Sequence, residues 1–431
     1  MTNAETLALD PAYVFHSWSA QGALKPLVVS GGQGSHVWDD EGRKLLDFSS
    51  QLVNVNIGFG HPAVVAAIQE QAAALATVAP ATANHQRGLA AQKILSRAPS
   101  GFAKVFFTNG GADANENAIR MARQFTGRNK VLSTYRSYHG NTGSAIVATG
   151  DWRRPAGNEF ARDHVHFFGP YLYRSEFWAT TPEEESARAL QHLRRVIESE
   201  GPATIAALLI ESIPGTAGIL MPPPGYLAGV RALCDEFGII LITDEVMAGF
   251  GRTGEWLALD AFGYTPDLIT FAKGVNSGYV PVGGVMISAP ISEFFDERVF
   301  PGGLTYSGHP LAMASIIAAL DAMATEGIVA NAKRIGSDVI APALEKMAAT
   351  YDVVGEVRGT GVFHAIELVA DRSTRAPLPA ADMAGLKGKL LERGLLPFIQ
   401  DNRIHVVPPC VVTDEEAHEG LAIIDDVLST L

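Results

Sequence analysis

Short apolar runs and amphipathic stretches alternate through the middle of the chain. Residues 205–210 (IAALLI) form an apolar run of strand length, and three prolines at 222–224 break the chain after it. In residues 226–237 apolar side chains recur at helical spacing, and Gly238 stands where such a helix would end. A second apolar run follows at 239–243. This order predicts a strand–helix–strand unit of the kind that builds parallel sheets.

The same pattern recurs on both sides of that unit. Upstream, residues 105–107 are predicted as a strand, 110–111 as a glycine turn and 118–125 as part of a helix with one apolar face. Downstream, residues 268–271 and 282–288 are predicted as further strands. The chain is therefore predicted to contain an α/β domain with a mostly parallel central sheet, as in an open twisted α/β fold.

The character of the sequence changes near residue 310, where helical stretches lead into a final α+β segment. At the other end, residues 29–50 have the short strands and turns of a β-meander. We therefore predict a large α/β domain at 61–310 and a smaller α+β domain built from both termini, residues 1–60 and 311–431.

Charge and composition exclude several classes of function. The chain has 431 residues and a formal charge of −13, which does not suit a general nucleic-acid binder. No apolar run approaches the ~18 residues that cross a bilayer, and the N-terminus does not resemble a secretory signal. Cys234 and Cys410 form no disulfide or metal motif, and the twelve histidines show no metal-ligand spacing. We expect a cytoplasmic protein without a metal site or a membrane partner.

Two chemically active residues stand at the ends of apolar runs. Asp244 closes the run at 239–243, and Lys273 follows the run at 268–271. Open α/β sheets bind ligands at the carboxyl ends of their strands. A lysine held in an apolar pocket has a lowered pKa and can form a Schiff base with a carbonyl. Taken alone, Lys273 is more simply explained as a strand-end lysine that reaches solvent.

A glycine pair adds a third element. Gly110 and Gly111 open a predicted helix, where backbone N–H groups and the helix dipole favour an anion such as phosphate. The sequence here matches neither GxxxxGK[ST] nor GxGxxG, so a P-loop NTPase and a NAD-linked dehydrogenase are both disfavoured. A phosphate cradle, an acid for a pyridine nitrogen and a Schiff-base lysine are together the three anchors of pyridoxal phosphate.

Six motifs extend this pattern over nearly the whole chain: FTNGGADANENAIRMAR, YRSYHGNT, LLIESIPGTAGILMPPPGYL, LITDEVMAGFGRTG, PDLITFAKG and GLTYSGHPLAMA. With them the sequence resembles the class III (omega) aminotransferases, a family of fold-type I pyridoxal-phosphate enzymes. The resemblance implies that fold, pyridoxal phosphate as cofactor, and catalysis by Lys273, Asp244 and Tyr138. The cofactor-binding residues that it implies are Gly110, Gly111, Ala112, Tyr138, His139, Asp244, Val246, Lys273 and Thr305.

The resemblance also implies individual roles. Lys273 is similar to the lysine that bonds the cofactor and moves a proton, and Asp244 to the acid that keeps the ring nitrogen protonated. Tyr138 is implied on one face of the ring and Val246 on the other. Thr305 matches a residue that reaches the phosphate from the partner subunit, so the resemblance implies a homodimer or a larger assembly.

The chain departs from the family pattern at several places. Gly110 and Ala112 lack the hydroxyls that are usual in the phosphate loop, which predicts somewhat weaker cofactor retention. Met247 replaces the glutamine of relatives that act on ornithine or 4-aminobutyrate, as in the amine:pyruvate branch. His405 occupies the position of the substrate arginine in ornithine-type relatives, and Phe398 that of the mobile arginine in the amine:pyruvate type.

The residues around the substrate are less well defined by the sequence. Val53, Glu211 and Thr216 fall where relatives line the substrate pocket, and the small Val53 predicts a wide one. Arg403 is the nearest arginine to the family positions. It is either a displaced clamp for a substrate carboxylate or an exposed strand residue.

These features predict a transaminase that moves an amino group from an ω-amino acid or a primary amine to a 2-oxo acid, expected to be pyruvate. The transfer would run as two ping-pong half-reactions. One alternative is an aminomutase or racemase of the same fold. Another is a catalytically silent paralogue that serves as a binding subunit.

Overall fold

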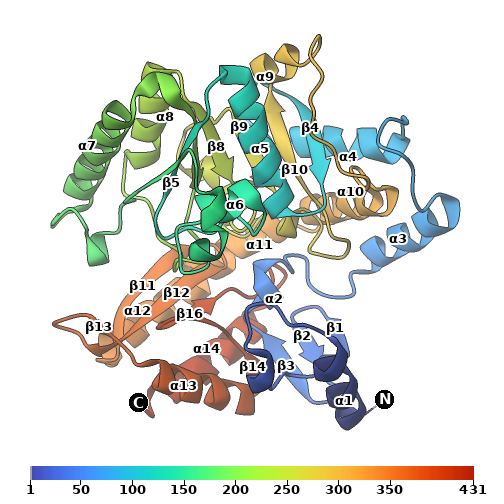
Figure 1. Cartoon of the computed structure of the whole chain (residues 1–431). Coiled ribbons are helices and arrows are strands. Elements are labelled where there is room, and N and C mark those ends of the chain that lie inside the picture. Colours follow the sequence, from blue (N-terminus) through green and yellow to red (C-terminus); the bar gives the residue numbers. More distant parts are fainter. Residues whose placement is uncertain (1) are drawn as a thin grey trace.

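A seven-stranded sheet forms the centre of the molecule in the computed structural model, which describes residues 2–431 (Figure 1). The strands lie in the order β4-β10-β9-β8-β7-β5-β6. Only β10 runs antiparallel to its neighbours, so the prediction of a mostly parallel sheet is confirmed. The strands are β4 (Phe102–Thr108), β5 (Lys130–Thr134), β6 (His164–Phe167), β7 (Ile205–Glu211), β8 (Ile240–Asp244), β9 (Leu268–Phe271) and β10 (Gly283–Ser288).

Both faces of this sheet are buried. On β8, Leu241 belongs to one apolar cluster, whereas its neighbours Ile240 and Ile242 belong to a second. Because side chains alternate along a strand, the two clusters lie on opposite faces of the sheet. Strands covered on both faces need apolar residues at successive positions, which explains the continuous apolar runs in the sequence.

Helices supply the two covers (Figure 1). α5 (Gly111–Thr126) packs against β7, β8, β9 and β10, while α7 (Pro182–Glu200) and α8 (Tyr226–Phe237) pack together on the other cluster. α8 buries Leu227, Val230 and Leu233, and it ends at Gly238, whose φ of 62° is the left-handed conformation that glycine adopts readily. The helix predicted from this spacing and its terminal glycine is confirmed.

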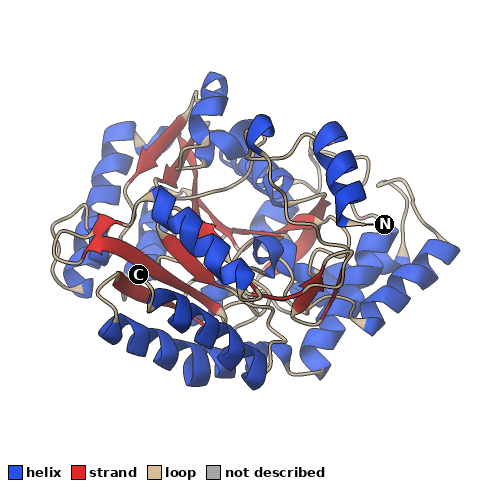
Figure 2. Ribbon diagram, turned by 90° about the horizontal axis from the view of Figure 1, so that it is seen from below, coloured by secondary structure: helices blue, strands red, loops and turns tan. Residues whose placement is uncertain are grey.

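Segments from the two ends of the chain lie side by side below the large sheet in Figure 1, and Figure 2 shows them from that side. β1 (Gly31–Gln33), β2 (His36–Trp38) and β3 (Lys44–Asp47) form the predicted meander, and β14 (Leu395–Leu396) pairs with β3. A further sheet contains β11 (Val354–Thr360), β12 (Phe363–Asp371), β13 (Ala376–Pro377), β15 (Phe398–Gln400) and β16 (Arg403–Val406).

The remaining helices complete the description. They are α1 (Asn3–Tyr13), α2 (Ser50–Val53), α3 (Pro62–Ala74), α4 (His85–Leu95), α6 (Gly143–Ala148), α9 (Ala289–Phe294), α10 (Pro310–Thr325), α11 (Ile328–Ile335), α12 (Ala341–Thr350), α13 (Ala380–Glu392) and α14 (Asp414–Leu428). α10 begins where the second domain is predicted to start, yet it packs against α3 and α4, which lie in the predicted large domain. The domain boundary at 310 therefore stays a prediction. Within residues 2–431, no single helix is long and apolar enough to cross a membrane; the bent pair of 310–325 and 328–350 meets only the length and composition test.

Candidate active site

A cavity of about 370 Å³ lies beyond the carboxyl ends of β7, β8 and β9. Its volume falls in the range of small-molecule sites, and its place follows the rule for open α/β sheets. The predicted site residues that line it are Gly110, Gly111, Ala112, Tyr138, His139, Glu211, Thr216, Asp244, Val246 and Lys273. Val53, Thr305 and Arg403 are not part of this lining.

Asp244, at the end of β8, is buried and held by three donors. Asn115 Nδ2 lies 2.7 Å and His139 Nδ1 2.8 Å from Asp244 Oδ2, and the Val246 N–H donates to Oδ1 over 3.0 Å. Asn115 is itself fixed, because its Oδ1 accepts a bond of 2.8 Å from Thr270 Oγ1. Asn115 was not identified from the sequence, although it stands inside the glycine-loop motif. These contacts hold the carboxylate in one orientation.

Lys273 follows β9 and opens a short 3₁₀ turn with a φ of 43°. A non-glycine residue in this region is strained, and such strain gathers at functional sites. Burial lowers the pKa of Lys273 to about 8, and the positive charges of Arg153 and Arg252 act in the same direction, against the attraction of Asp244 and Glu211. An amine with this pKa is partly neutral near pH 7, as a nucleophile and proton carrier requires.

The glycine turn lies at the N-terminus of α5. Gly110 is the N-cap, and a Cβ atom placed on it would meet nothing within 4 Å. By contrast, a Cβ on Gly111 would lie 2.9 Å from both methyl carbons of Val246. Gly111 therefore allows Val246 to pack closely against the turn, and Gly110 leaves open space where a phosphate can approach the helix N-terminus.

Tyr138 has a partner that the sequence did not reveal. The guanidinium of Arg153 lies over the Tyr138 ring, 3.7 Å from its centroid, in a cation–π arrangement. Asp151 holds Arg153 through Nε, at 3.1 Å and 3.0 Å, and through Nη2. Leaving aside residues 158–160, whose side chains the structure does not describe, the Nη1 atom of Arg153 donates to no residue. Arg153, like Arg403, is not part of the cavity lining, but its fixed positive charge lies against the ring of Tyr138, which is.

Glu211 lies at the end of β7 and accepts two backbone bonds, from the Tyr138 N–H at 3.1 Å and from the Gly215 N–H at 2.8 Å. Burial raises the pKa of Glu211 to about 7; His139 opposes this rise, and the nearby Asp244 adds to it. The two oxygens of Glu211 fix the backbone on both sides of the pocket.

Arg403, predicted as either a displaced substrate clamp or an exposed strand residue, has a side chain that is only 13% exposed, and its role stays a prediction. Arg403 Nη2 pairs with Asp401 at 2.5 Å, and Arg403 does not line the pocket. His405 is fully buried, and burial lowers its pKa well below the usual value, so its imidazole carries no charge for a carboxylate. Its ring packs edge to face with Phe398, with centroids 4.8 Å apart.

Met247, which lines the cavity, packs into an apolar cluster that lies behind the lining. Val53 and Met247 belong to one apolar cluster together with Phe363, and Thr216 Oγ1 lies 3.7 Å from the Met247 sulfur. Thr305, in contrast, is exposed on the single chain. Its predicted contact with the cofactor of a partner subunit stays a prediction.

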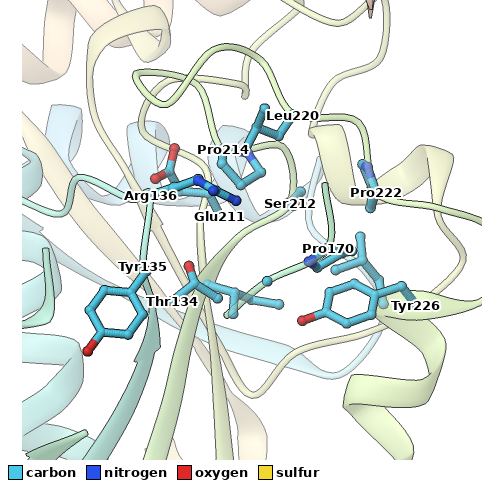
Figure 3. Close-up of a pocket in the computed structure, with 13 residues that line it drawn as sticks. Thr134, Tyr135, Arg136, Pro170, Glu211, Ser212, Pro214, Leu220, Pro222 and Tyr226 are labelled. Atoms are coloured by element: carbon cyan, nitrogen blue, oxygen red, sulfur yellow. The ribbon is translucent and has the colours of Figure 1, made fainter. Parts of the chain in front are cut away.

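A smaller cavity of about 30 Å³ lies on the other side of Glu211, among Thr134, Arg136, Pro170 and Tyr226 (Figure 3). The Tyr226 hydroxyl is buried without a hydrogen-bond partner in the described part of the chain and points into this space (Figure 3). The volume suits one or two water molecules and excludes a substrate.

The larger cavity has the features that pyridoxal phosphate requires. An oriented carboxylate, an amine with a lowered pKa and the open N-terminus of α5 all face one space. These are the partners for the ring nitrogen, the aldehyde and the phosphate of the cofactor, respectively.

Comparison with known proteins agrees with this geometry. The sequence matches the family described as aminotransferase class-III over residues 18–428. A taurine–pyruvate aminotransferase from Bilophila wadsworthia is 30% identical over 449 residues, 99% of this chain and 98% of the relative. Among solved structures, a taurine:2-oxoglutarate aminotransferase from Bifidobacterium kashiwanohense, in complex with PLP and glutamate, is 41% identical with a TM-score of 0.96, covering 100% of this chain and 98% of that one. A thermostable (S)-enantioselective omega-transaminase from Thermomicrobium roseum is 36% identical with a TM-score of 0.92, covering 100% and 99%.

Proposed function

This chain belongs to the class III aminotransferases, and from that premise we propose that its amino donor carries an anionic group, a sulfonate or a carboxylate, at the end opposite its amine. The chain is a pyridoxal-phosphate-dependent transaminase that passes an amino group to a 2-oxo acid. The proposal concerns the donor, for which the sequence left an ω-amino acid and an uncharged amine as alternatives. We propose pyruvate as the acceptor, as in the taurine–pyruvate relatives.

The observation that carries the donor proposal is the position of Arg153. Its guanidinium is fixed by Asp151 and by the Tyr138 ring, and its charge lowers the pKa of Lys273, so it acts on the space where the substrate amine must react. A guanidinium donates well to planar carboxylates and to sulfonates. An anionic donor group would satisfy the Nη1 donor of Arg153, whereas an uncharged amine would not.

The residues of the chain have distinct proposed tasks. Pyridoxal phosphate, when bound, supplies the electron sink that weakens the C–H bond beside the substrate nitrogen. Asp244, oriented by Asn115 and His139, holds a proton on the ring nitrogen. Lys273 bonds the cofactor at rest and then carries the proton, for which a pKa of about 8 is suitable. Tyr138 and Val246 cover the two faces of the ring.

The experiment compares wild type with Arg153→Met on taurine, β-alanine and the uncharged 1-phenylethylamine, each with pyruvate and with 2-oxoglutarate. Loss of a charge-assisted bond of about 1.5–3 kcal/mol predicts a fall in kcat/KM of roughly 10- to 150-fold for the two anionic donors. For 1-phenylethylamine the change should stay within about threefold. An equal loss on all three donors, or a wild type that prefers 1-phenylethylamine, would contradict the proposal.

We also propose a homodimer in the cytoplasm. Thr305 and its neighbour Tyr306 are exposed on the single chain, Tyr306 by 61%, as expected of a loop that meets a partner. Cys234 and Cys410 are both buried and unbridged, which suits a reducing compartment. Light scattering on the purified protein tests the dimer, and a monomer that retains full activity would contradict it.

A further inference from the structure

Arg252, in the GFGRTG motif, is fully buried although its side chain is charged. Burial lowers the pKa of its guanidinium, and no carboxylate in the described part of the chain forms an ion pair with it. Nη1 donates to the carbonyl oxygens of Val362, at 3.2 Å, and Pro408. Nη2 donates to Ser50 Oγ at 3.1 Å and to Asn56 Oδ1 at 2.8 Å. A buried cation with only neutral partners is costly, so its retention calls for an explanation.

Two of these partners belong to a strained segment beside the pocket, residues 50–56, which we call the elbow. Ser50, Gln51 and Val53 all have positive φ angles, of 44°, 60° and 58°. A β-branched residue such as Val53 rarely adopts this conformation, and it persists only where surrounding contacts impose it. The Ser50 hydroxyl makes a second contact by donating to the Val407 carbonyl over 2.6 Å. The elbow is therefore held at its base by Arg252 and by Val407, which directly follows β16.

The elbow forms part of the substrate side of the pocket. Leu52 and Asn54 line the cavity that contains Lys273, while Val53 packs in the apolar cluster with Met247. Leu52 is also 49% exposed, so its position depends on the backbone of the elbow more than on its own packing. A shift at Ser50 would move the lining residues directly.

The far end of the elbow meets the lysine turn. Asn56 accepts from Arg252 and donates through Nδ2 to the Phe250 carbonyl over 2.7 Å. The same Nδ2 atom packs so closely on Gly274 that a Cβ there would lie 2.3 Å from it. One residue further, the Ile57 N–H donates to Ser277 Oγ over 2.8 Å. Arg252 thus anchors a segment that runs from the apolar cluster to the turn after β9.

We propose that Arg252 is a positioning residue for substrate: its guanidinium fixes the elbow, and through Leu52 and Asn54 it sets the wall against which the amino donor binds. It touches neither substrate nor cofactor. The inference goes beyond transaminase activity and does not depend on which donor the enzyme prefers. Because Nη1 and Nη2 of one planar guanidinium donate to four acceptors, a lysine at 252 can replace it only in part.

The test uses the holoenzyme and the best donor of the wild type among taurine, β-alanine and 1-phenylethylamine. Arg252→Met is expected to raise the donor KM about tenfold or more, with kcat changed less than about threefold, since misplaced binding groups reduce substrate binding first. Cofactor content, read from the visible absorption of the protein, should stay at the wild-type value. The donor KM of Arg252→Lys should fall between those of wild type and Arg252→Met. Arg162→Met, at a side chain that is 93% exposed, serves as the matched control.

Ser50→Ala provides a second route that does not remove the buried charge. It deletes one acceptor of Arg252 together with the bond to Val407, and a threefold or larger rise in donor KM is expected. If Arg252→Met fails to fold, the Ser50→Ala result decides alone. A donor KM within twofold of wild type in every folded variant overturns the proposal, and so does a loss confined to kcat or to cofactor content. The donor proposal is tested separately, because the ranking of the three donors by the wild-type enzyme would contradict it before any Arg252 or Ser50 variant is measured.

Discussion

Replacing Gly110 with serine is expected to tighten cofactor binding. The φ and ψ of Gly110 are −179° and −177°, an extended conformation that any residue adopts, and a Cβ there meets nothing within 4 Å. The residue lines the pocket and caps α5, and its position has no side-chain cap bond. A serine hydroxyl placed there can donate to a bound phosphate. The chain should therefore accept serine without strain.

The size of the gain follows from the kind of bond. Hydrogen bonds to charged groups contribute about 1.5–3 kcal/mol, but a phosphate at a partly open helix N-terminus is also solvated. We therefore expect about 1 kcal/mol, or roughly a fivefold lower Kd for pyridoxal phosphate. Gly110→Ala should leave the Kd within about twofold, because it adds the Cβ without the hydroxyl.

The neighbouring glycine provides a control of opposite sign. A Cβ on Gly111 would lie 2.9 Å from two carbons of Val246, so Gly111→Ala must displace that side chain. Overpacking of this kind costs about 1–3 kcal/mol, which predicts a Kd raised roughly 5- to 150-fold.

The assay is equilibrium titration of apoprotein with pyridoxal phosphate, followed by absorbance, with thermal unfolding of each apoprotein as a check on folding. The Kd for pyridoxal phosphate should be lower in Gly110→Ser than in wild type, and higher in Gly111→Ala. If the serine variant binds no tighter than Gly110→Ala, the hydroxyl does not reach the phosphate. If Gly111→Ala binds like wild type, the contact with Val246 does not shape the site.

Two further predictions concern Lys273 and Thr305. The pKa of Lys273 in the folded protein, about 8, lies below its ordinary value of 10.5. In the apoprotein, the charge on this lysine therefore destabilises the fold below pH 8. This destabilisation decreases as the pH rises toward 10.5. Lys273→Met apoprotein should therefore be more stable than wild type at pH 7, by about 1–3 kcal/mol in urea, with a smaller difference at pH 9.5; an equal difference at both pH values would contradict this. Thr305→Ala should weaken pyridoxal phosphate binding several-fold without dissociating the proposed dimer, measured by titration and light scattering. Unchanged affinity would contradict the predicted contact of Thr305 with the cofactor of a partner subunit.

The sequence predicted the parts of the fold that local pattern determines. The strands at 205–210 and 239–243 were evident because both faces of the central sheet are buried and each position must be apolar. The rule that ligands bind at strand ends then brought Asp244 and Lys273 to one cavity, where the structure places them. The individual roles of these residues stay predictions.

The elbow could not be predicted in the same way. Nothing in residues 50–53 (SQLV) indicates positive φ angles, since none of these residue types favours them. The conformation is imposed by contacts with Arg252 and Val407, which lie about 200 and 350 residues away along the chain. A single sequence carries no signal for such long-range contacts.

Arg153 shows a second limit of sequence reasoning. Among the family positions near the C-terminus, the sequence offers Arg403 as a substrate clamp, but this residue is bound to Asp401 outside the pocket lining. The charge that acts on the reacting amine comes instead from the segment after α6, where it is held by Asp151 and the Tyr138 ring. Cation–π stacking between residues fifteen apart leaves no local pattern. If Arg153 binds the donor, specificity in this chain depends on the loop after α6, and changes in β15 and β16 should alter stability more than donor preference.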